Sequence, residues 1–457
     1  MKKVLSFVLC AVLVVTCICS CTKQDKPTTS NANTKEDAIR IVDSYANDSL
    51  DKCKYNTSTC ITMSTGSSST EIKSTGYLEY EKQGDDYTHY NYTSAHTSNN
   101  KKIESTTAYH DGLFYYSNGE KIKIKSEISA AQFEEYLTFG ENLPGESKDF
   151  SSIKFVNEND TYTLTMSDLK FDAVIQANKY LEKELGYMDG SVDKLKSLKI
   201  VATFDKDFNI NQILFTIECD SELGVYVKLE LDMTDFETNF TPSAPAGSDE
   251  YKNVEGAQYY SLAENGLSSL PYANKYSAKS SITTLIKGCN NPYESAYKMT
   301  VNKSNNDIDA SQEIVRGDEK GTVYSYANKV FTVKDSSGTQ SFDYTLQEAE
   351  EFASYCIIPA TELDFDEIES IKLTESGDSK TIKITPASEY GCDLLNEISK
   401  LAYCEHSTIT ALRENYIEIT FTGHNITGVK YRFTTSDGCV AEYSLSYTYK
   451  ELTAESI

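Results

Sequence analysis

Short runs in which apolar and polar residues alternate are the main pattern of this chain, and they predict β-hairpins. In the first half, the run at residues 113–116 lies between an Asp-Gly pair ending at Gly112 and an Asn-Gly pair ending at Gly119. In the second half, the run at residues 330–333 precedes a Ser-Gly pair ending at Gly338. Such pairs favour the tight turns that join antiparallel strands. A hairpin is therefore predicted at the corresponding place in each half.

Each predicted hairpin leads into a helix that begins with a capping box. Ser129 and Gln132 have the required spacing in the first half, and Thr345 and Glu348 have it in the second half, 216 residues later. In a capping box the hydroxyl accepts a hydrogen bond from the third helical amide, and the longer side chain accepts one from the amide of the cap residue. These signals predict that both halves repeat the order hairpin, then helix.

The correspondence between the halves continues for more than a hundred residues. Residues 152–155 correspond to 370–373, and a helical stretch follows in each half, at 173–181 and at 394–398. Three strands are predicted to close each half, at 198–204, 212–219 and 225–231 and at 416–421, 429–434 and 441–449. We therefore predict an α+β fold with two tandem copies of a curved antiparallel sheet, a half-barrel with a few helices packed on it.

A proline-rich break, TPSAPAG at residues 241–247, separates the two copies. Proline, glycine and small residues in this density mark a boundary between folded segments. The sequence thus predicts a first domain at residues 35–240, a linker at 241–275 and a second domain at 276–457.

An amphipathic helix capped by Thr34 is predicted at residues 35–50, and three strand-like segments follow it. These are GYLEYEK at 76–82, residues 87–92, and AYHDGLFYY at 108–116. This order resembles the start of the LolA-like lipoprotein carriers and related acyl-anchored lipoproteins. The resemblance implies a half-open barrel around helices, with an apolar cavity for acyl chains or an apolar surface. The alternative is that the same apolar positions simply fill the core.

The amino end of the chain carries a secretory signal. Lys2 and Lys3 precede an apolar run at residues 4–15, which is too short for a membrane span. The following Ile-Cys-Ser-Cys, ending at Cys21, resembles the lipobox of bacterial lipoproteins. The resemblance implies that residues 1–20 are removed and that the Cys21 thiol carries a diacylglyceryl group. Polar residues without apolar periodicity follow Cys21, so residues 21–34 are predicted to form a flexible tether. The alternative is an ordinary secreted protein cleaved near this position.

The composition of the chain limits which binding partners are possible. The formal net charge of −26, with no cluster of Lys and Arg, argues against nucleic acid as a partner. The chain has 33 Tyr and no Trp, and we expect tyrosine to be abundant on the outward faces of the sheets.

Eight cysteines follow Cys21 in the sequence. Cys53 and Cys60 are the pair close enough to suggest a local disulfide, and the alternative is that both are buried free thiols.

Catalytic and metal-binding motifs are missing from the sequence. The nucleophile-elbow, zinc-protease, phosphate-loop and dinucleotide motifs do not occur. Paired acids such as Glu134 and Glu135 are expected to be solvated, and the acidic run at 364–369 lacks the glycine and spacing of a calcium loop. The histidines are scattered, which gives no support to a zinc site; they are His89, His96, His110, His406 and His424. We therefore expect no enzyme activity, no cofactor and no metal.

Two kinds of function remain open for a protein held on the extracytoplasmic side of the cell membrane by a lipid on Cys21. The first is a non-enzymatic carrier or sensor that binds an apolar ligand, such as a lipid or acyl chain, in a half-barrel cavity. The second is a structural module of the cell envelope that contacts a protein or the cell wall and has no small-molecule ligand.

Overall fold

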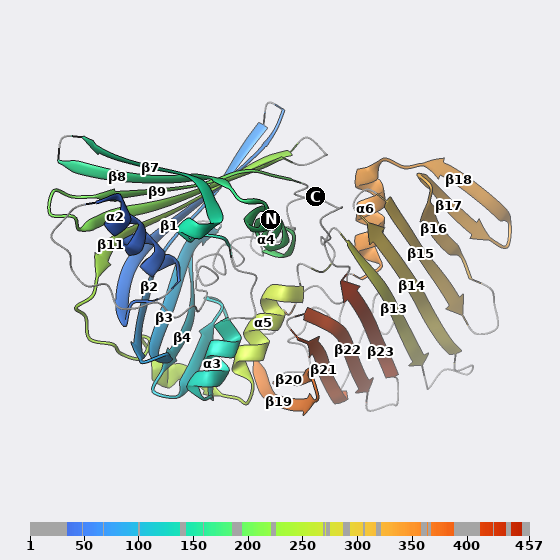
Figure 1. Ribbon diagram of the computed structural model, residues 1–457. Coiled ribbons are helices and arrows are strands. Elements are labelled where there is room, and N and C mark those ends of the chain that lie inside the picture. Colours follow the sequence, from blue (N-terminus) through green and yellow to red (C-terminus); the bar gives the residue numbers. More distant parts are fainter. Residues whose placement is uncertain are drawn as a thin grey trace. The chain divides into compact units, whose positions relative to one another are not determined.

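The computed structural model describes residues 34–449, except for 48, 67, 99–100, 138–142, 159, 185–193, 221–224, 268–269, 271–274, 287–292, 305–306, 317–320, 358–362, 364–366, 388–411, 424 and 436–439. Contacts divide the chain into two units, one up to Asn253 and one from Val254 onward. Each unit is built on one large sheet (Figure 1).

The first unit contains a twelve-stranded sheet in the order β12-β6-β5-β4-β3-β2-β1-β11-β10-β9-β8-β7. Its strands are β1 (Lys52–Thr65), β2 (Ser68–Gln83), β3 (Asp86–Ser98), β4 (Lys101–His110), β5 (Leu113–Ser117), β6 (Lys123–Glu127), β7 (Phe150–Glu158), β8 (Thr161–Leu169), β9 (Lys194–Phe204), β10 (Ile210–Asp220), β11 (Val225–Glu237) and β12 (Lys252–Asn253). Its helices are α2 (Lys35–Ala46), α3 (Ala130–Leu137) and α4 (Phe171–Glu184). All of its strand pairs are antiparallel except β12 with β6, which is parallel.

The second unit contains an eleven-stranded antiparallel sheet in the order β18-β17-β16-β15-β14-β13-β23-β22-β21-β20-β19. Its strands are β13 (Lys275–Ile286), β14 (Tyr293–Ser304), β15 (Asp307–Arg316), β16 (Val323–Ala327), β17 (Val330–Asp335), β18 (Gly338–Asp343), β19 (Ile368–Ser376), β20 (Ser379–Pro386), β21 (Leu412–Thr422), β22 (Asn425–Thr435) and β23 (Val440–Tyr449). Its helices are α5 (Ala257–Leu267) and α6 (Leu346–Tyr355).

The strand orders of the two sheets correspond one to one, with β1 matching β13 and β11 matching β23, apart from the additional β12. Helix α3 follows β6 as α6 follows β18, and both capping boxes are formed. The Ser129 amide donates to Gln132 over 2.8 Å, and the Thr345 amide donates to Glu348 over 2.8 Å. The helix predicted at 173–181 is α4, whereas the stretch at 394–398 lies outside the described residues.

The predicted α+β class is wrong, because strands make up most of the described chain. The five helices described have 8 to 14 residues each, while several strands of the first sheet have 13 to 16. The sequence alternates apolar with Ser, Thr and Tyr over long stretches, and this period of two favours long strands over helices. The protein is therefore a mostly β protein, with short helices that cover parts of each sheet.

The sequence predicts tyrosines on the outward faces of the sheets, and the structure places many of them in the cores. Eight of the eleven largest fully buried side chains are tyrosines. In the second unit, Tyr276 and Tyr447 stack with ring centroids 4.8 Å apart, and the Tyr447 hydroxyl donates to the Leu270 carbonyl over 2.5 Å. A phenol can fill a core and satisfy its hydroxyl on a nearby carbonyl. In a chain without tryptophan, tyrosine supplies much of the aromatic core.

We call the sheet face that packs against α3 or α6 the inner face. In the first unit, Phe133 of α3 stacks on Tyr109 at 4.7 Å and contacts Tyr90 at 5.2 Å and Tyr87 at 5.6 Å. In the second unit, Phe331 stacks on Tyr344 at 4.3 Å and contacts Phe352 of α6 at 5.1 Å. The aromatic rings of the inner faces thus pack directly on one another beneath the helices.

Candidate functional site

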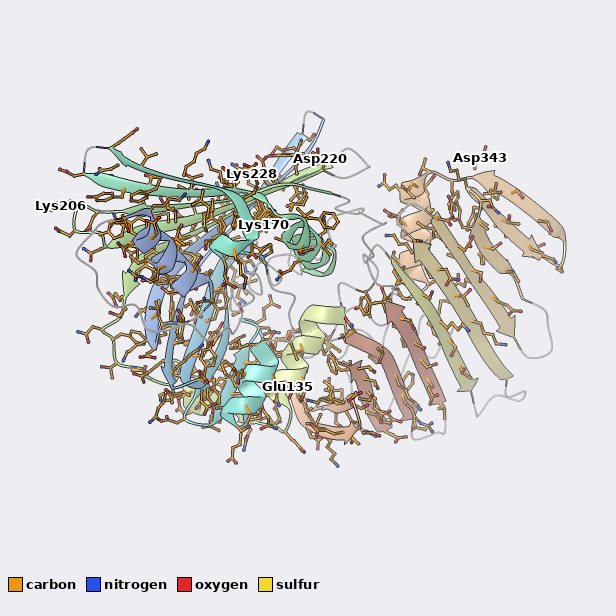
Figure 2. All side chains as sticks on the ribbon, viewed as in Figure 1. Glu135, Lys170, Lys206, Asp220, Lys228 and Asp343 are labelled. Atoms are coloured by element: carbon orange, nitrogen blue, oxygen red, sulfur yellow. The ribbon has the colours of Figure 1, made fainter. Side chains whose placement is uncertain are left out.

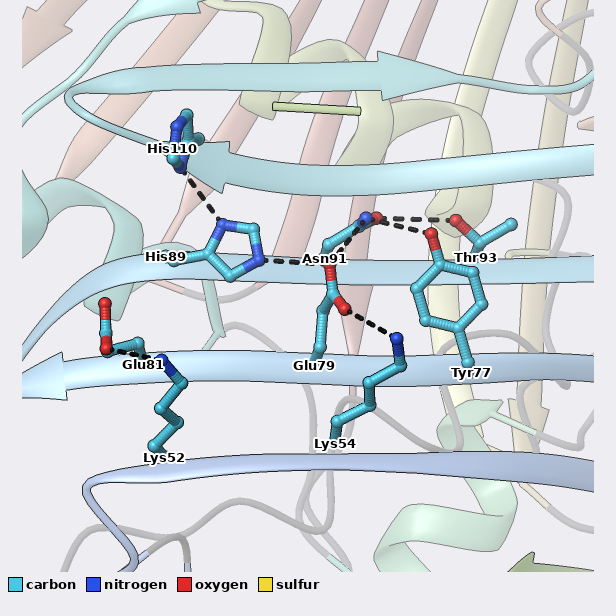
Figure 3. Close-up of polar contacts among 9 residues, drawn as sticks. All are labelled: Lys52, Lys54, Tyr77, Glu79, Glu81, His89, Asn91, Thr93 and His110. Atoms are coloured by element: carbon cyan, nitrogen blue, oxygen red, sulfur yellow. Dashed lines mark hydrogen bonds and ion pairs between the residues drawn. The ribbon is translucent and has the colours of Figure 1, made fainter. Parts of the chain in front are cut away.

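The outer face of the first sheet, opposite α3, carries a network of polar side chains (Figure 3). Strand register places them side by side, because Glu79 pairs with Asn91 across β2 and β3, and His89 pairs with His110 across β3 and β4. Lys54 on β1 pairs with Glu79 in the same way. Directly opposed residues of neighbouring strands project to the same face, so these five groups meet.

Glu79 is the centre of the network. Its Oε1 lies 3.3 Å from His89 Nε2 and accepts from Asn91 Nδ2 over 3.4 Å, while Oε2 lies 3.4 Å from Lys54 Nζ. Asn91 Nδ2 also donates to the Tyr77 hydroxyl over 3.0 Å. Glu79 is 7% exposed and His89 is 1% exposed, so these contacts replace water.

The charge on Glu79 is maintained by its neighbours. Burial acts to raise the pKa of the Glu79 carboxyl, but the hydrogen bond and charge of His89, the charge of Lys54 and the amide of Asn91 outweigh burial and lower it below its usual value. An ionised Glu79 requires a hydrogen on His89 Nε2. The ring nitrogens His89 Nδ1 and His110 Nδ1 are 3.1 Å apart, within hydrogen-bonding distance.

Residues 238–253, which we call the crossing segment, pass over this network. The Phe240 ring lies 6.5 Å from the His89 ring, and Lys52 Nζ and Lys54 Nζ lie 4.7 Å and 5.9 Å from its centre. Cations over an aromatic face are attracted to it. Phe240 therefore links the crossing segment to both lysines and screens His89 from solvent.

The crossing segment is also fixed at its other end, beside β5 and β6. The Tyr251 ring contacts the Tyr115 ring edge-on at 5.4 Å. Lys125 Nζ donates to the Ser248 carbonyl over 3.0 Å, and Lys123 forms an ion pair with Glu250. Strand β12 then adds to the edge of β6. The polar network is thus an interior contact between the sheet and the crossing segment.

This arrangement can hold a charge and pass a proton between Glu79, His89 and His110, but its groups bind one another. Among the residues that the structure describes, no group of three or more His, Cys, Asp and Glu side chains could hold a metal ion. In the sequence His89 and His110 are 21 residues apart and lie on neighbouring predicted strands. The sequence does not predict the register that pairs them.

The remaining predicted site residues fall into two groups. Cys21, the predicted lipidation site, lies outside the described residues, as do Asp364 and Asp366 of the acidic run. The suggested bridge between Cys53 and Cys60 is absent, and neither residue forms a disulfide. They lie seven residues apart on β1, about 23 Å at the usual strand rise, and therefore cannot form a disulfide.

Two other described cysteines, Cys219 and Cys356, are free and buried. Burial raises the pKa of each thiol to about 12. Thiols with such values stay protonated at neutral pH and are unreactive. They behave as small core residues.

Among the described residues, no helix combines the length and apolar character needed to cross a membrane. No known protein-family profile matches the chain, and no curated protein matches it either.

Matches to solved structures are weak. An AttH protein of Nitrosomonas europaea is 9% identical, with 87% of this chain and 92% of that chain covered and a TM-score of 0.14. Transferrin-binding protein B of Haemophilus parasuis is 7% identical, with coverages of 88% and 77% and a TM-score of 0.13. A porin-like protein of Bacteroides uniformis is 8% identical, with coverages of 86% and 97% and a TM-score of 0.11. Scores this low support no conclusion about fold or function.

Proposed function

We propose that this chain is a lipid-anchored protein of the cell envelope whose second unit binds a macromolecular partner, a protein or a cell-wall polymer, through the outer face of its sheet. The signal that ends at Cys21 supports the anchor and the extracytoplasmic location. The observation that carries the binding role is a difference between the outer faces of the two units.

Equivalent positions on the two outer faces can be found from the strand registers. Phe114 and Phe331 are taken as equivalent, because each contacts an aromatic residue of the helix that covers its sheet, Phe133 in α3 and Phe352 in α6. By this register Thr300 takes the place of Glu79 and Ser311 the place of Asn91. Their hydroxyls are hydrogen-bonded at 2.7 Å. Neutral hydroxyl groups thus replace the Glu79–Asn91 pair, while Lys279, which pairs with Thr300, takes the place of Lys54.

The outer face of the second unit is also open to solvent where its counterpart is covered. Lys279, Lys298, Thr300, Asn302 and Glu313 are exposed, whereas Glu79, His89 and Asn91 are buried under the crossing segment. No described residue covers this part of β13, β14 and β15 as the crossing segment covers β1 to β5. A broad sheet face with donors, acceptors and both signs of charge suits polar recognition of a large partner.

The carrier function receives less support from the packing. The inner faces, where the LolA-like resemblance implies an apolar cavity, are filled by aromatic rings in contact with one another. Phe133, Phe114 and Tyr90 are all fully buried in protein contacts. A bound acyl chain would need these rings to move apart, at the cost of their packing.

Site-directed photocrosslinking in cells that produce the full lipoprotein tests the proposal. A photoreactive residue at Thr300 is expected to capture one defined partner, identified by mass spectrometry. The same residue at Thr75, an exposed threonine on β2, is the matched control. Equal labelling at both positions, or a stoichiometric acyl ligand in lipid extracts of the purified protein, would contradict the proposal and favour the carrier.

The anchor has its own test. Cys21→Ser removes the acyl acceptor, so the protein is expected to move from the detergent phase to the aqueous phase on detergent partitioning. The intact mass of the wild-type protein should exceed that of the chain beginning at residue 21 by the mass of its acyl groups. An unmodified mass with unchanged partitioning would exclude lipidation at Cys21.

A further inference from the structure

The edge strand β18 of the second sheet is the counterpart of β6 in the first. Phe114 pairs with Ser126 and Phe331 pairs with Phe342, so Ser341 corresponds to Lys125, one position before each. Thr339 corresponds in the same way to Lys123. The two edges can therefore be compared residue by residue.

In the first unit, the chain covers this edge itself. Strand β12 pairs with Ile124 and Lys125 of β6, and the two lysines of β6 hold the crossing segment through Glu250 and the Ser248 carbonyl. The edge of β6 therefore has little room for another chain.

In the second unit, no strand of the described chain pairs with the outer edge of β18. All six of its residues are exposed, and Phe342 is 47% exposed. Threonine and serine replace the two lysines, and Asp343, labelled in Figure 2, is its one charged residue. Proteins usually protect such edges with charges, proline or a covering segment, because an open edge recruits another strand.

The edges at the other ends of the two sheets have such protection. On β7, Lys35 of α2 donates to the Ile153 carbonyl over 2.8 Å, and Lys154 lies beside it. On β19, Glu369, Lys372 and Glu375 are distributed along the strand. Strand β12 is also exposed, but one of its two residues is the charged Lys252. Among the described sheet edges, β18 thus combines full exposure with the lowest proportion of charged residues.

We propose that β18 pairs antiparallel with β18 of a second copy of this chain and joins the two sheets across a two-fold axis. A two-fold axis perpendicular to the sheet sets one residue opposite its own copy, because neighbouring residues of a strand project to opposite faces. With the axis at Gln340, Thr339 lies opposite Ser341 and Gly338 lies opposite Phe342. Asp343 then lies opposite Ser337, so no like charges face each other across the junction.

This pairing produces a dimer and does not continue into a longer assembly. A two-fold contact uses the same strand on both chains, and the covered β6 offers no second site of this kind. The contact is small, so the dimer is expected to be weak. Without Lys2 and Lys3 each chain carries a formal charge of −28, and salt is expected to strengthen the association by screening the repulsion between copies.

Sedimentation velocity of the chain from residue 22 onward, which retains every described residue, tests this proposal at concentrations up to roughly 200 µM. We expect the weight-average sedimentation coefficient to rise toward the dimer value with concentration and with salt. The double variant Thr339→Lys and Ser341→Lys, which gives β18 the lysines of β6, is expected to remain a monomer. The matched control, Thr75→Lys with Asn157→Lys, adds the same charge at two exposed positions and is expected to dimerise as the wild type does.

Hydrogen exchange locates the contact. Amides of residues 338–343 are expected to gain protection as concentration rises, while those of β7 do not change. A wild-type protein that stays monomeric at all concentrations, or a dimer that persists in the β18 double-lysine variant, would overturn the proposal. Neither result bears on partner capture at Thr300, which tests the proposed function separately.

Discussion

At the residue scale, the close approach of β2 and β3 depends on Gly76. A Cβ atom at this position would lie 2.1 Å from the Thr93 carbonyl oxygen, which belongs to the backbone of β3 and cannot rotate away. Gly76→Ala is therefore expected to push the two strands apart and to lower the free energy of unfolding by about 2–3 kcal/mol. Urea unfolding measures the loss. Thr75→Ala, one residue away and exposed, is the control and should be close to neutral.

Glu79 sets a pH dependence at the same scale. Its pKa is lowered in the folded protein, so its contribution to stability is fully present above the pKa of the unfolded chain, near 4.5, and is lost as pH falls through the folded value. Glu79→Gln is thus expected to destabilise the protein at pH 6 and to cost much less near pH 3.5. Urea unfolding at the two pH values checks this. The exposed Glu127→Gln is the control, and a cost for Glu79→Gln that does not depend on pH would show that the charge is not what matters.

At the element scale, α6 begins with a capping box that can be removed by one substitution. The Thr345 hydroxyl accepts from the Glu348 amide over 3.2 Å, and the Glu348 carboxylate accepts from the Thr345 amide over 2.8 Å. Thr345→Ala is expected to lower the stability of the second unit by about 1 kcal/mol. Thermal unfolding followed by circular dichroism measures the change. Ser129→Ala, at the matching box of α3, should have a similar effect on the first unit, and no effect at either position would show that the caps are not needed.

Local signals were enough to predict many elements. Both capping boxes, the helix starting after Thr34 and the hairpin strands near Leu113 and Val330 follow from turn and cap chemistry over a few residues, and the structure confirms them. The class was mispredicted because the lengths of the strands were not apparent from short matches. Such lengths depend on which neighbouring strands pair.

The polar network and the crossing segment needed information that a single sequence lacks. Glu79, His89 and His110 lie on three strands, and only the pairing register brings them together. The break at 241–247 has the composition of a linker, yet Phe240 and Tyr251 at its flanks are anchors on the sheet. Composition indicates where a chain leaves regular structure, but it does not say where that segment packs.

At the scale of the whole molecule, two large sheets with separate cores predict two unfolding transitions. The core of the first unit gathers around Phe133, and that of the second unit around Phe331 and Tyr447. Units with their own cores can unfold separately, because breaking one core leaves the apolar contacts of the other intact. Differential scanning calorimetry of the chain from residue 22 onward should then show two transitions.

A buried ion pair of the second unit can assign those transitions. Lys303 Nζ on β14 lies 3.1 Å from Glu350 Oε1 on α6, with side chains 3% and 14% exposed. Glu350→Gln removes the carboxylate charge beside the buried Lys303 ammonium, and breaking a buried ion pair in this way costs about 3–5 kcal/mol. We expect it to lower one transition and leave the other in place, while Gly76→Ala lowers only the other. Lys303→Met together with Glu350→Leu replaces both charges and should restore most of the loss. If either single variant shifted both transitions equally, the two sheets would have to unfold as one cooperative body.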